Sequence, residues 1–512
     1  MTEKIKVLRD SAAMRWTALL LAILIVLPTL IACGKSEEDY TTAATTTAAP
    51  VEGSTAATEP AETEDIAVAN VPEDADYTGH TFTFLVGGNI ENGREKNDFE
   101  AETMTGEALN DAIYNRNLAI EERFGIKIET FEEYGNSNNG KGLSYQRLSK
   151  SYMANDTEYD AAMVSGYDVS TLAYSGYLYD MNEVPYIDVT QRWWDQKVNQ
   201  DLTVGNRLYY TTGDISTADN DATCAILFSK DLVAQNNLEN PYELVESGKW
   251  TLDKMLEMCS QVHADLDGNG KYDVNDRIGA IVWDDTMMAW INASGAKCCT
   301  MSESGELTLT LNDERTMEFF DKLPSFYADE IAYAYQRVSY DITDPINMFA
   351  NNQALFFAQL LDLVSYLRDM ETDFGLLPQP KASEDQKEYY NTIGSWHSVF
   401  LCIPGVQANV ERTGVIIESL AAESYNVVTP AYYEQTLVGK YVRDEESVAT
   451  LDIILATRVY DLGWFYGIGG YNEAVMNVWR KDANNFASMY KAVERVAQKS
   501  LDQINDAFAK LQ

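Results

Sequence analysis

The most regular pattern of chemically useful side chains lies between Asp265 and Asp276, in the sequence DLDGNGKYDVND. Oxygen-bearing groups recur along this stretch, and Gly270 stands where a calcium-binding loop needs a residue that permits a sharp turn. Because Ca²⁺ takes about six to eight oxygen ligands, the spacing predicts a structural Ca²⁺ site, although Asp276 replaces the glutamate that ends an EF-hand loop. The predicted ligands are Asp265, Asp267, Asn269, the carbonyl of Lys271, Asp273 and Asp276. A polar turn without metal is the alternative.

Residue types that carry hydrolytic chemistry are scarce. The chain has three histidines, His80, His263 and His397, and it contains neither an HExxH zinc motif nor a GxSxG nucleophile motif. A pair of carboxylates acting as in a glycosidase needs only two acids, and spacing in sequence does not exclude it. We therefore expect no enzymatic activity, with a carbohydrate-active enzyme as the alternative.

Several tryptophans lie near the ends of predicted strands and in the segments that follow them. They are Trp193, Trp194, Trp283, Trp290, Trp396 and Trp464. The apolar faces of sugar rings stack on aromatic rings, while sugar hydroxyls bond to Asp, Asn and Gln side chains. A single tryptophan more often belongs to a core, but the clustering of these residues favours a carbohydrate ligand.

The N-terminus has the pattern of a secretory signal. Basic residues precede an unbroken apolar run from Ala18 to Leu27, and Leu30-Ile31-Ala32-Cys33 places a small residue before a cysteine. These last four residues resemble the lipobox of bacterial lipoproteins, which implies a signal peptide over residues 1–32 and a lipid on Cys33. An uncut spanning helix is the alternative, but it needs about 20 apolar residues, and this run is shorter and interrupted by Pro28. We expect the rest of the chain to be extracellular, anchored on the outer face of the cell membrane.

Charge and cysteine content restrict the partners. The chain has 38 basic and 80 acidic residues, a net charge of -42, which repels nucleic acid and anionic lipid headgroups and argues against a strongly anionic ligand. The cysteines besides Cys33 show no zinc-site spacing, and we expect most of them to be buried thiols. They are Cys224, Cys259, Cys298, Cys299 and Cys402.

The order of the predicted elements indicates an α/β protein. Residues 33–76 are rich in Thr, Ala, Glu and Pro and contain too few apolar residues to fold, so they predict a disordered tether. A strand from Thr81 to Val86 enters Gly87-Gly88-Asn89, and strands over 126–131 and 159–164 then alternate with helices. This alternation is typical of a mostly parallel sheet, in which ligands bind beyond the carboxyl ends of the strands.

Four stretches resemble a known family when they are taken in order. They are GKWTLDK at 248–254, FANNQALFFAQ at 349–359 leading to FGLLPQP at 374–380, SWHSVFLCIP at 395–404, and the segment from Thr429 to Leu462. Together with the lipobox they resemble the extracellular solute-binding proteins of ABC importers, family 1 type, found as lipoproteins of Gram-positive bacteria.

The resemblance implies a two-lobed, periplasmic-binding-protein-like (type II) α/β fold with mixed, mostly parallel sheets and a ligand cleft between the lobes. We expect lobe 1 to comprise 77–214 and 396–456, and lobe 2 to comprise 220–394 and 458–512. The crossovers should lie near 214–222, 394–398 and 457–463.

The expected function is capture of an oligosaccharide or a related glycoside by a monomer that delivers it to ABC permease subunits. An extracellular carbohydrate-active enzyme and a ligand-sensing partner of a membrane receptor are the alternatives. Residues that follow predicted strands or flank the crossovers are expected to bind the ligand. They are Ser165, Tyr167, Asp168 and Asp214 from the first lobe, Trp283, Asp284 and Gln359 from the second, and Trp396 and Trp464 beside the later crossovers.

Overall fold

The computed structural model describes residues 66–89, 96–136, 140–327, 331–367, 370–433, 445–481 and 486–511. The signal sequence, Cys33 and most of the expected tether lie outside these residues. Within the described ranges, no helix has both the length and the apolar character needed to cross a membrane.

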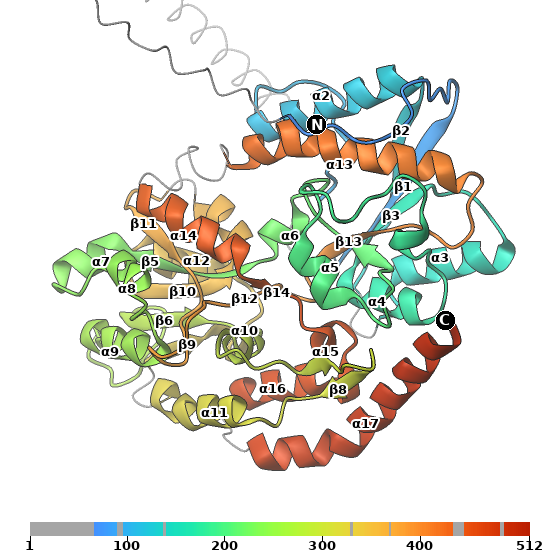
Figure 1. Ribbon diagram of the computed structural model, residues 1–512. Coiled ribbons are helices and arrows are strands. Elements are labelled where there is room, and N and C mark those ends of the chain that lie inside the picture. The colour runs from blue at the N-terminus through green and yellow to red at the C-terminus, as the bar shows by residue number, and fades with distance from the viewer. Residues whose placement is uncertain are drawn as a thin grey trace, which may run out of the picture. The chain divides into compact units, whose positions relative to one another are not determined.

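The first lobe is built on a five-stranded sheet with the order β2-β1-β3-β13-β4 (Figure 1). The strands are β1 (Thr81–Val86), β2 (Lys127–Glu132), β3 (Ala161–Ser165), β4 (Tyr210–Thr211) and β13 (Val399–Cys402). β1 pairs in parallel with β2 and β3, whereas β13 runs antiparallel to β3 and β4. Helix α13 lies against α2. The helices of this lobe are α2 (Ala108–Phe124), α3 (Leu143–Ala154), α4 (Gly166–Tyr174), η2 (Met181–Glu183), α5 (Gln196–Leu202) and α13 (Val410–Tyr433).

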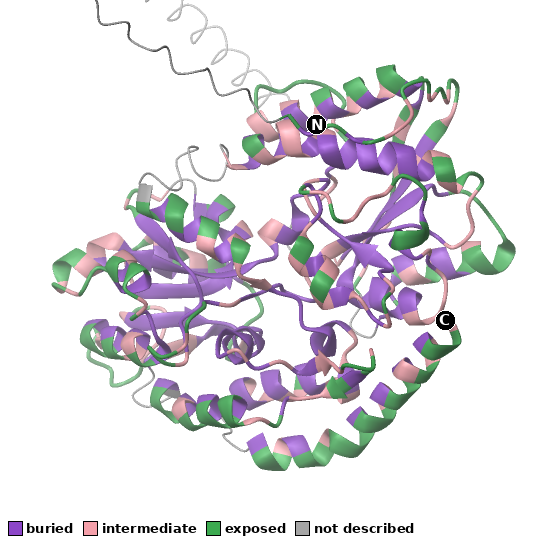
Figure 2. Cartoon of the chain, viewed as in Figure 1, coloured by how far each residue is buried: buried purple, intermediate pink, exposed green. Residues whose placement is uncertain are grey.

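The second lobe is built on another five-stranded sheet, with the order β11-β5-β10-β6-β9. Its central strand β10 has the sequence ALFFAQL and is buried along its whole length (Figure 2). β10 is parallel to β6 and antiparallel to β5. The strands are β5 (Cys224–Ser229), β6 (Ile278–Val282), β9 (Ala332–Ala334), β10 (Ala354–Leu360) and β11 (Phe374–Leu377), with a β7 (Cys299–Met301) and β8 (Leu307–Leu309) hairpin beside them.

Helices cover this second sheet. One of them, α9, begins where the sequence predicts, because the hydroxyl of Thr251 accepts a hydrogen bond from the amide of Lys254. The helices are α7 (Lys230–Gln235), α8 (Pro241–Glu246), α9 (Leu252–Val262), α10 (Thr286–Ala293), α11 (Glu314–Tyr327), η4 (Tyr335–Arg337), α12 (Thr343–Ala350), η5 (Leu361–Leu367) and α14 (Glu445–Ala456).

Three segments connect the lobes side by side. The first contains α6 (Ala218–Asp221), and Thr223 after it pairs with Ile393. The second contains β12 (Asn391–Thr392), which pairs in parallel with β14 (Arg458–Val459) of the third. The expected two-lobed α/β fold with three crossovers is therefore confirmed.

The C-terminal helices contact both lobes. They are α15 (Leu462–Phe465), η7 (Ile468–Gly470), α16 (Tyr471–Arg480) and α17 (Phe486–Leu511). α16 packs against α10 of the second lobe, and α17 packs against α4 of the first lobe. Also in the first lobe, the ring of Tyr209 lies 5.7 Å from the ring of Phe508 on α17.

Two expected boundaries need correction. Ala67 and Ala69, assigned to the tether, are buried, and the backbone of Ala67 exchanges two hydrogen bonds with the side chain of Asn426. Helix α14 packs against β11 and α8, so residues 445–456 belong to the second lobe and not to the first. Short-range sequence patterns do not report such long-range partners.

Candidate ligand cleft between the lobes

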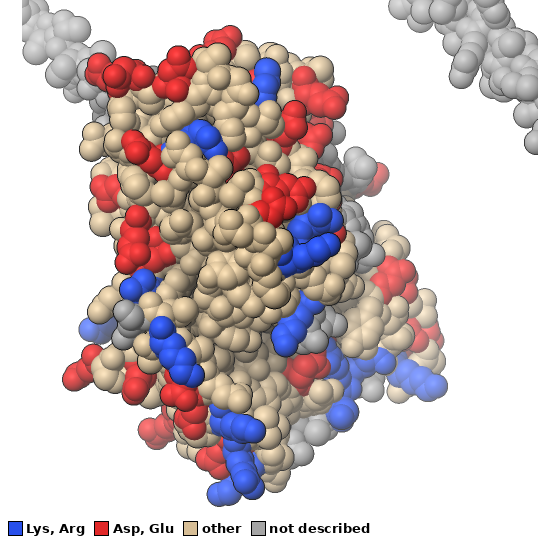
Figure 3. Space-filling model, turned by 90° about the vertical axis from the view of Figure 1, so that its right-hand side faces the viewer, with Lys and Arg blue, Asp and Glu red and all other residues tan. Residues whose placement is uncertain are grey.

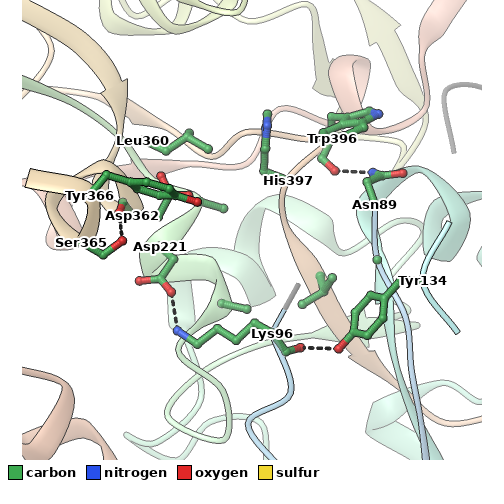
Figure 4. Close-up of a pocket in the computed structure, with 14 residues that line it drawn as sticks. Asn89, Lys96, Tyr134, Asp221, Leu360, Asp362, Ser365, Tyr366, Trp396 and His397 are labelled. Carbon is green, nitrogen blue, oxygen red and sulfur yellow. Dashed lines mark hydrogen bonds and ion pairs between the residues drawn. The ribbon is translucent and has the colours of Figure 1, made fainter. Parts of the chain in front are cut away.

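A cavity of about 190 Å³ lies where the two lobes and the crossovers meet (Figure 4). Lobe 1 contributes Gly88, Asn89, Lys96 and Tyr134, and lobe 2 contributes Leu360, Asp362, Ser365 and Tyr366. The crossovers and their flanks contribute Ala218, Asp221, Ala222, Trp396, His397 and Val399. Figure 4 shows side chains of the two lobes on opposite sides of the cavity, with His397 between them and Trp396 beside Asn89.

The carboxyl ends of two strands position the cavity. Gly88 and Asn89 follow β1, and Leu360 ends β10 and leads into η5 with Asp362. Gly88 lets the backbone approach β13, because a Cβ atom there would lie 3.1 Å from Cγ1 of Val399. The cavity thus lies where open α/β sheets place their ligands.

An ion pair between Lys96 and Asp221 crosses the floor of the cavity. Asp221 also accepts a hydrogen bond from the hydroxyl of Tyr432 at 3.0 Å. Burial alone would lower the pKa of Lys96, but the charges of Asp221 and Asp98 outweigh it and raise that pKa. Lys96 therefore stays charged, and its charge is balanced within the protein.

Aromatic rings and polar groups share the remaining wall. The indole of Trp396 lies 4.8 Å from the imidazole of His397, measured between ring centroids, and the carbonyl of Trp396 accepts a hydrogen bond from Nδ2 of Asn89. The hydroxyl of Tyr134 donates to the carbonyl of Lys96 at 3.0 Å. Rings beside amide, carboxylate and hydroxyl groups suit a ligand with apolar faces and polar edges.

Of the nine ligand-binding residues expected from the sequence, only Trp396 lines this cavity. In lobe 1, Ser165 is 1% exposed, and Asp168 accepts hydrogen bonds from the amides of Gly142 and Tyr145 at the start of α3. Asp214 accepts a hydrogen bond from Thr429, and burial raises the pKa of Asp214 to about 7. These carboxylates hold the lobe together.

The other predicted residues lie in or behind the inner wall of the cleft. Tyr167 accepts hydrogen bonds from Ser395 and Asn472, and Asp284 accepts hydrogen bonds from Arg480 and Gln336. Gln359 donates a hydrogen bond to Tyr335. Trp464 donates a hydrogen bond to Asn292. The ring of Trp283 lies 5.2 Å from that of His397 and so supports a residue that lines the cavity. Eight of the nine predicted residues thus lie outside the lining of this cavity, and their part in ligand binding stays a prediction.

Two residues of the cavity that were not predicted from the sequence lie shortly after strands. Asn89 follows the first predicted strand, and Asp362 follows the strand that ends at Leu360, so the rule for strand ends would have selected both. Lys96 and Asp221 gave no such signal, because 125 residues separate the two partners of the ion pair.

The loop predicted to bind calcium lies on the surface of lobe 2. Carboxylate oxygens of Asp265, Asp267 and Asp276 come within 4.8 Å of one another. Amides of Gly268 and Gly270 donate to Asp265, and Gly270 has a φ of +75°, the left-handed conformation that glycine adopts without strain. Asn269, Lys271 and Asp273 are in the same loop, which is compatible with the predicted ligand set.

A second hollow, of about 540 Å³, runs beside the edge strand β2. It lies on lobe 1 alone and is lined by four glutamates, among them Glu121, which pairs with Lys127. On the face shown in Figure 3, basic side chains are interspersed with acidic ones and form no continuous stripe.

Comparison with known proteins gives structural matches only. No protein-family model matches the chain, and no curated protein matches it. The ABC substrate-binding protein Lmo0181 of Listeria monocytogenes, solved with cycloalternan, superposes with a TM-score of 0.54 at 12% identity, covering 84% of this chain and 99% of that one. UgpB of Mycobacterium tuberculosis, solved with glycerophosphocholine, gives 0.53 at 17% identity, covering 83% and 99%.

A cyclo/maltodextrin-binding protein solved with maltotetraose gives a TM-score of 0.52 at 12% identity, covering 85% of this chain and 98% of that one. Because these sequence identities are low, the structural likeness shows a shared fold and nothing finer. The chain has the two-lobed fold of ABC transporter substrate-binding proteins.

Proposed function

We propose that this protein is the solute-binding component of an ABC importer and that it captures a carbohydrate in the cleft between its lobes. The observation that carries the proposal is the cavity at the carboxyl ends of β1 and β10, to which both lobes and the crossovers contribute. A ligand bound there contacts both lobes at once, so its binding energy favours the closed arrangement of the lobes. The closed form would dock on the permease subunits.

The walls of the cavity support a carbohydrate. Trp396 and Tyr366 offer rings for the apolar face of a sugar, while Asn89, Asp362 and Ser365 offer groups for its hydroxyls. The solved structures with this fold hold cycloalternan, maltotetraose and glycerophosphocholine, so a glycerophosphodiester is the competing ligand class. The net charge of -42 and the internal balance between Lys96 and Asp221 favour the uncharged sugar.

Two further features belong to the proposal. A lipid on Cys33 would hold the monomeric protein at the outer face of the cell membrane, close to the permease. A Ca²⁺ ion held by the loop from Asp265 to Asp276 would stabilise lobe 2 without taking part in ligand binding, because the loop does not line the cavity.

Native mass spectrometry of gently purified protein tests the proposal by identifying a co-purified ligand. We expect a mass that corresponds to a sugar and that is displaced by excess sugar of the same composition. A co-purified phosphodiester would contradict the carbohydrate class. Release of reducing sugar from a glycan by the purified protein would indicate an enzyme, and a genomic neighbour encoding a histidine kinase in place of a permease would indicate sensing.

A further inference from the structure

We infer that helix α16 fills the half of the interlobe cleft at the ends of β3 and β6, so that the ligand is a short saccharide of one or two rings. The inference rests on the proposed function and names the size class of its ligand. It comes from the side chains that meet α16 from opposite lobes.

The start of α16 forms a hydrogen bond with a side chain of the first lobe. Tyr167, the second residue after β3, is 7% exposed, and its hydroxyl accepts hydrogen bonds from Nδ2 of Asn472 at 3.1 Å and from Oγ of Ser395 at 3.2 Å. Asn472 is the second residue of α16. The side chain at this strand end therefore bonds to the helix and does not line the cavity.

The end of α16 forms a hydrogen bond with a side chain of the second lobe. Asp284, the second residue after β6, is 5% exposed, and it accepts hydrogen bonds from Nε of Arg480 at 2.6 Å and from Nε2 of Gln336 at 2.8 Å. Arg480 is the last residue of α16. One ten-residue helix thus bonds to both inner faces of the cleft.

The packing around α16 is that of a core and not of a movable lid. Val475 and Trp479 are 0% and 1% exposed, and the helix packs between α10 and α17. At the neighbouring strand end, a Cβ atom on Gly166 would lie 2.6 Å from the carbonyl of Ser395 and 2.8 Å from the ring of Phe465. This half of the cleft therefore has no room for a sugar ring, and moving α16 out would expose buried apolar side chains.

The segment from Ser395 to His397 separates the filled half from the open half. Ser395 bonds to Tyr167 beside α16, whereas Trp396 and His397 line the cavity. That cavity, of about 190 Å³, is smaller than the roughly 300–1,000 Å³ of pockets for drug-sized ligands. A cavity of this size favours a ligand of one or two rings over a long oligosaccharide.

A size series tests the inference on the full mature protein. Isothermal titration calorimetry would compare the mono-, di- and tetrasaccharides of the glucose, galactose, mannose and xylose series. In a series that binds, we expect the tetrasaccharide to bind no more than threefold tighter than the disaccharide. A tetrasaccharide that binds tenfold tighter or more would overturn the short-ligand inference while leaving carbohydrate capture intact; absence of binding in every series would instead contradict the proposed function.

Cysteine accessibility tests the filled half without any ligand. Ser365→Cys places a thiol in the cavity, and Ser395→Cys places one beside α16, while the five native cysteines in the described part of the chain are buried. We expect maleimide to label the Ser395→Cys protein at least a hundredfold more slowly than the Ser365→Cys protein. Asn472→Cys, on α16 itself, gives a second reading if Ser395→Cys perturbs folding by circular dichroism. Similar labelling rates in the cavity and beside α16 would overturn the inference.

Discussion

Nδ2 of Asn472 donates a hydrogen bond to the hydroxyl of Tyr167 at 3.1 Å across 305 residues of sequence. Tyr167 follows a strand of the first lobe, and Asn472 lies on a helix that packs on the second. The contact shows that the C-terminal helices are part of the inner wall of the cleft. It also explains why Tyr167, which lies at a strand end, does not face the cavity; the bond from Arg480 at the other end of that helix does the same for Asp284.

Removing an aromatic ring from the cavity should weaken ligand binding. Trp396→Ala and Tyr366→Ala should each raise the Kd about ten- to a hundredfold, which corresponds to about 1–3 kcal/mol for an aromatic surface that a ligand buries. Titration calorimetry with the co-purified ligand measures this effect. Exposed Tyr340→Ala, outside the cavity, is the matched control, and unchanged affinity in both cavity variants would contradict the assignment of the site.

Stability should fall as the pH rises from about 4.5 to about 7 because of Glu418. Burial raises the pKa of Glu418 from 4.5 to about 7, although Nε1 of Trp193 and of Trp194 donates to its carboxylate. A folded-state pKa above the unfolded value contributes stability that is present below about pH 4.5 and lost as the pH rises through about 7.

Urea unfolding at pH 5 and pH 8 measures this contribution. Glu418→Gln should reduce the loss of stability between these pH values by about 1–3 kcal/mol relative to wild type. Glu411→Gln, an exposed change on the same helix, should not. Equal pH dependence in wild type and Glu418→Gln would show that Glu418 stays ionised at neutral pH.

Loss of Arg458 should destabilise the crossovers. Its guanidinium donates to Asp219, at 2.7 Å, and to Asp195, and both carboxylates have side chains less than 10% exposed. Arg458→Met leaves two buried carboxylates without their cation, so we expect a loss of about 3–5 kcal/mol in the free energy of unfolding. Arg495→Met, at an exposed position of α17, should cost less than about 1 kcal/mol, and a similar small effect at Arg458 would contradict the role of the ion pairs.

Calcium should raise the melting temperature, and EDTA should lower it. A ligand that binds only the native state stabilises it by mass action. Asp265→Ala removes one of the three converging carboxylates without touching the buried Asp276, so it should abolish the sensitivity to EDTA. Asp385→Asn, an exposed change elsewhere on the chain, should preserve it. A melting temperature of the wild type that does not respond to EDTA would end the calcium proposal.

Cys33→Ser should release the protein from the membrane fraction or leave it uncut. The reason is that the thiol of Cys33 is the expected site of lipid attachment in the lipobox-like sequence. Fractionation and gel migration measure the outcome, with Ser36→Ala as a control that leaves the motif intact. A Cys33→Ser protein that fractionates and migrates as wild type does would contradict the lipid anchor.

Residue patterns along the chain predict the class of fold and the bounds of several elements. Strand β1 was predicted over its observed bounds, and the start of α9 was predicted from Thr251, because both depend on neighbouring residues: the alternation of a half-buried strand and a cap hydrogen bond to an amide three positions away. The converging acids between Asp265 and Asp276 likewise lie within one short loop. Local patterns of this kind depend only on residues that are close together in the sequence.

Which strand ends form the cavity depends on tertiary packing. Tyr167 and Asp284 are as well placed by their strands as Asn89 is, but α16 bonds to the first two and leaves the third at the open half. The ion pair of Lys96 with Asp221 and the docking of α14 on the second sheet also depend on contacts between distant segments. Such contacts form only when whole helices pack against both lobes. The spacing of residues within a short stretch of sequence therefore does not predict them.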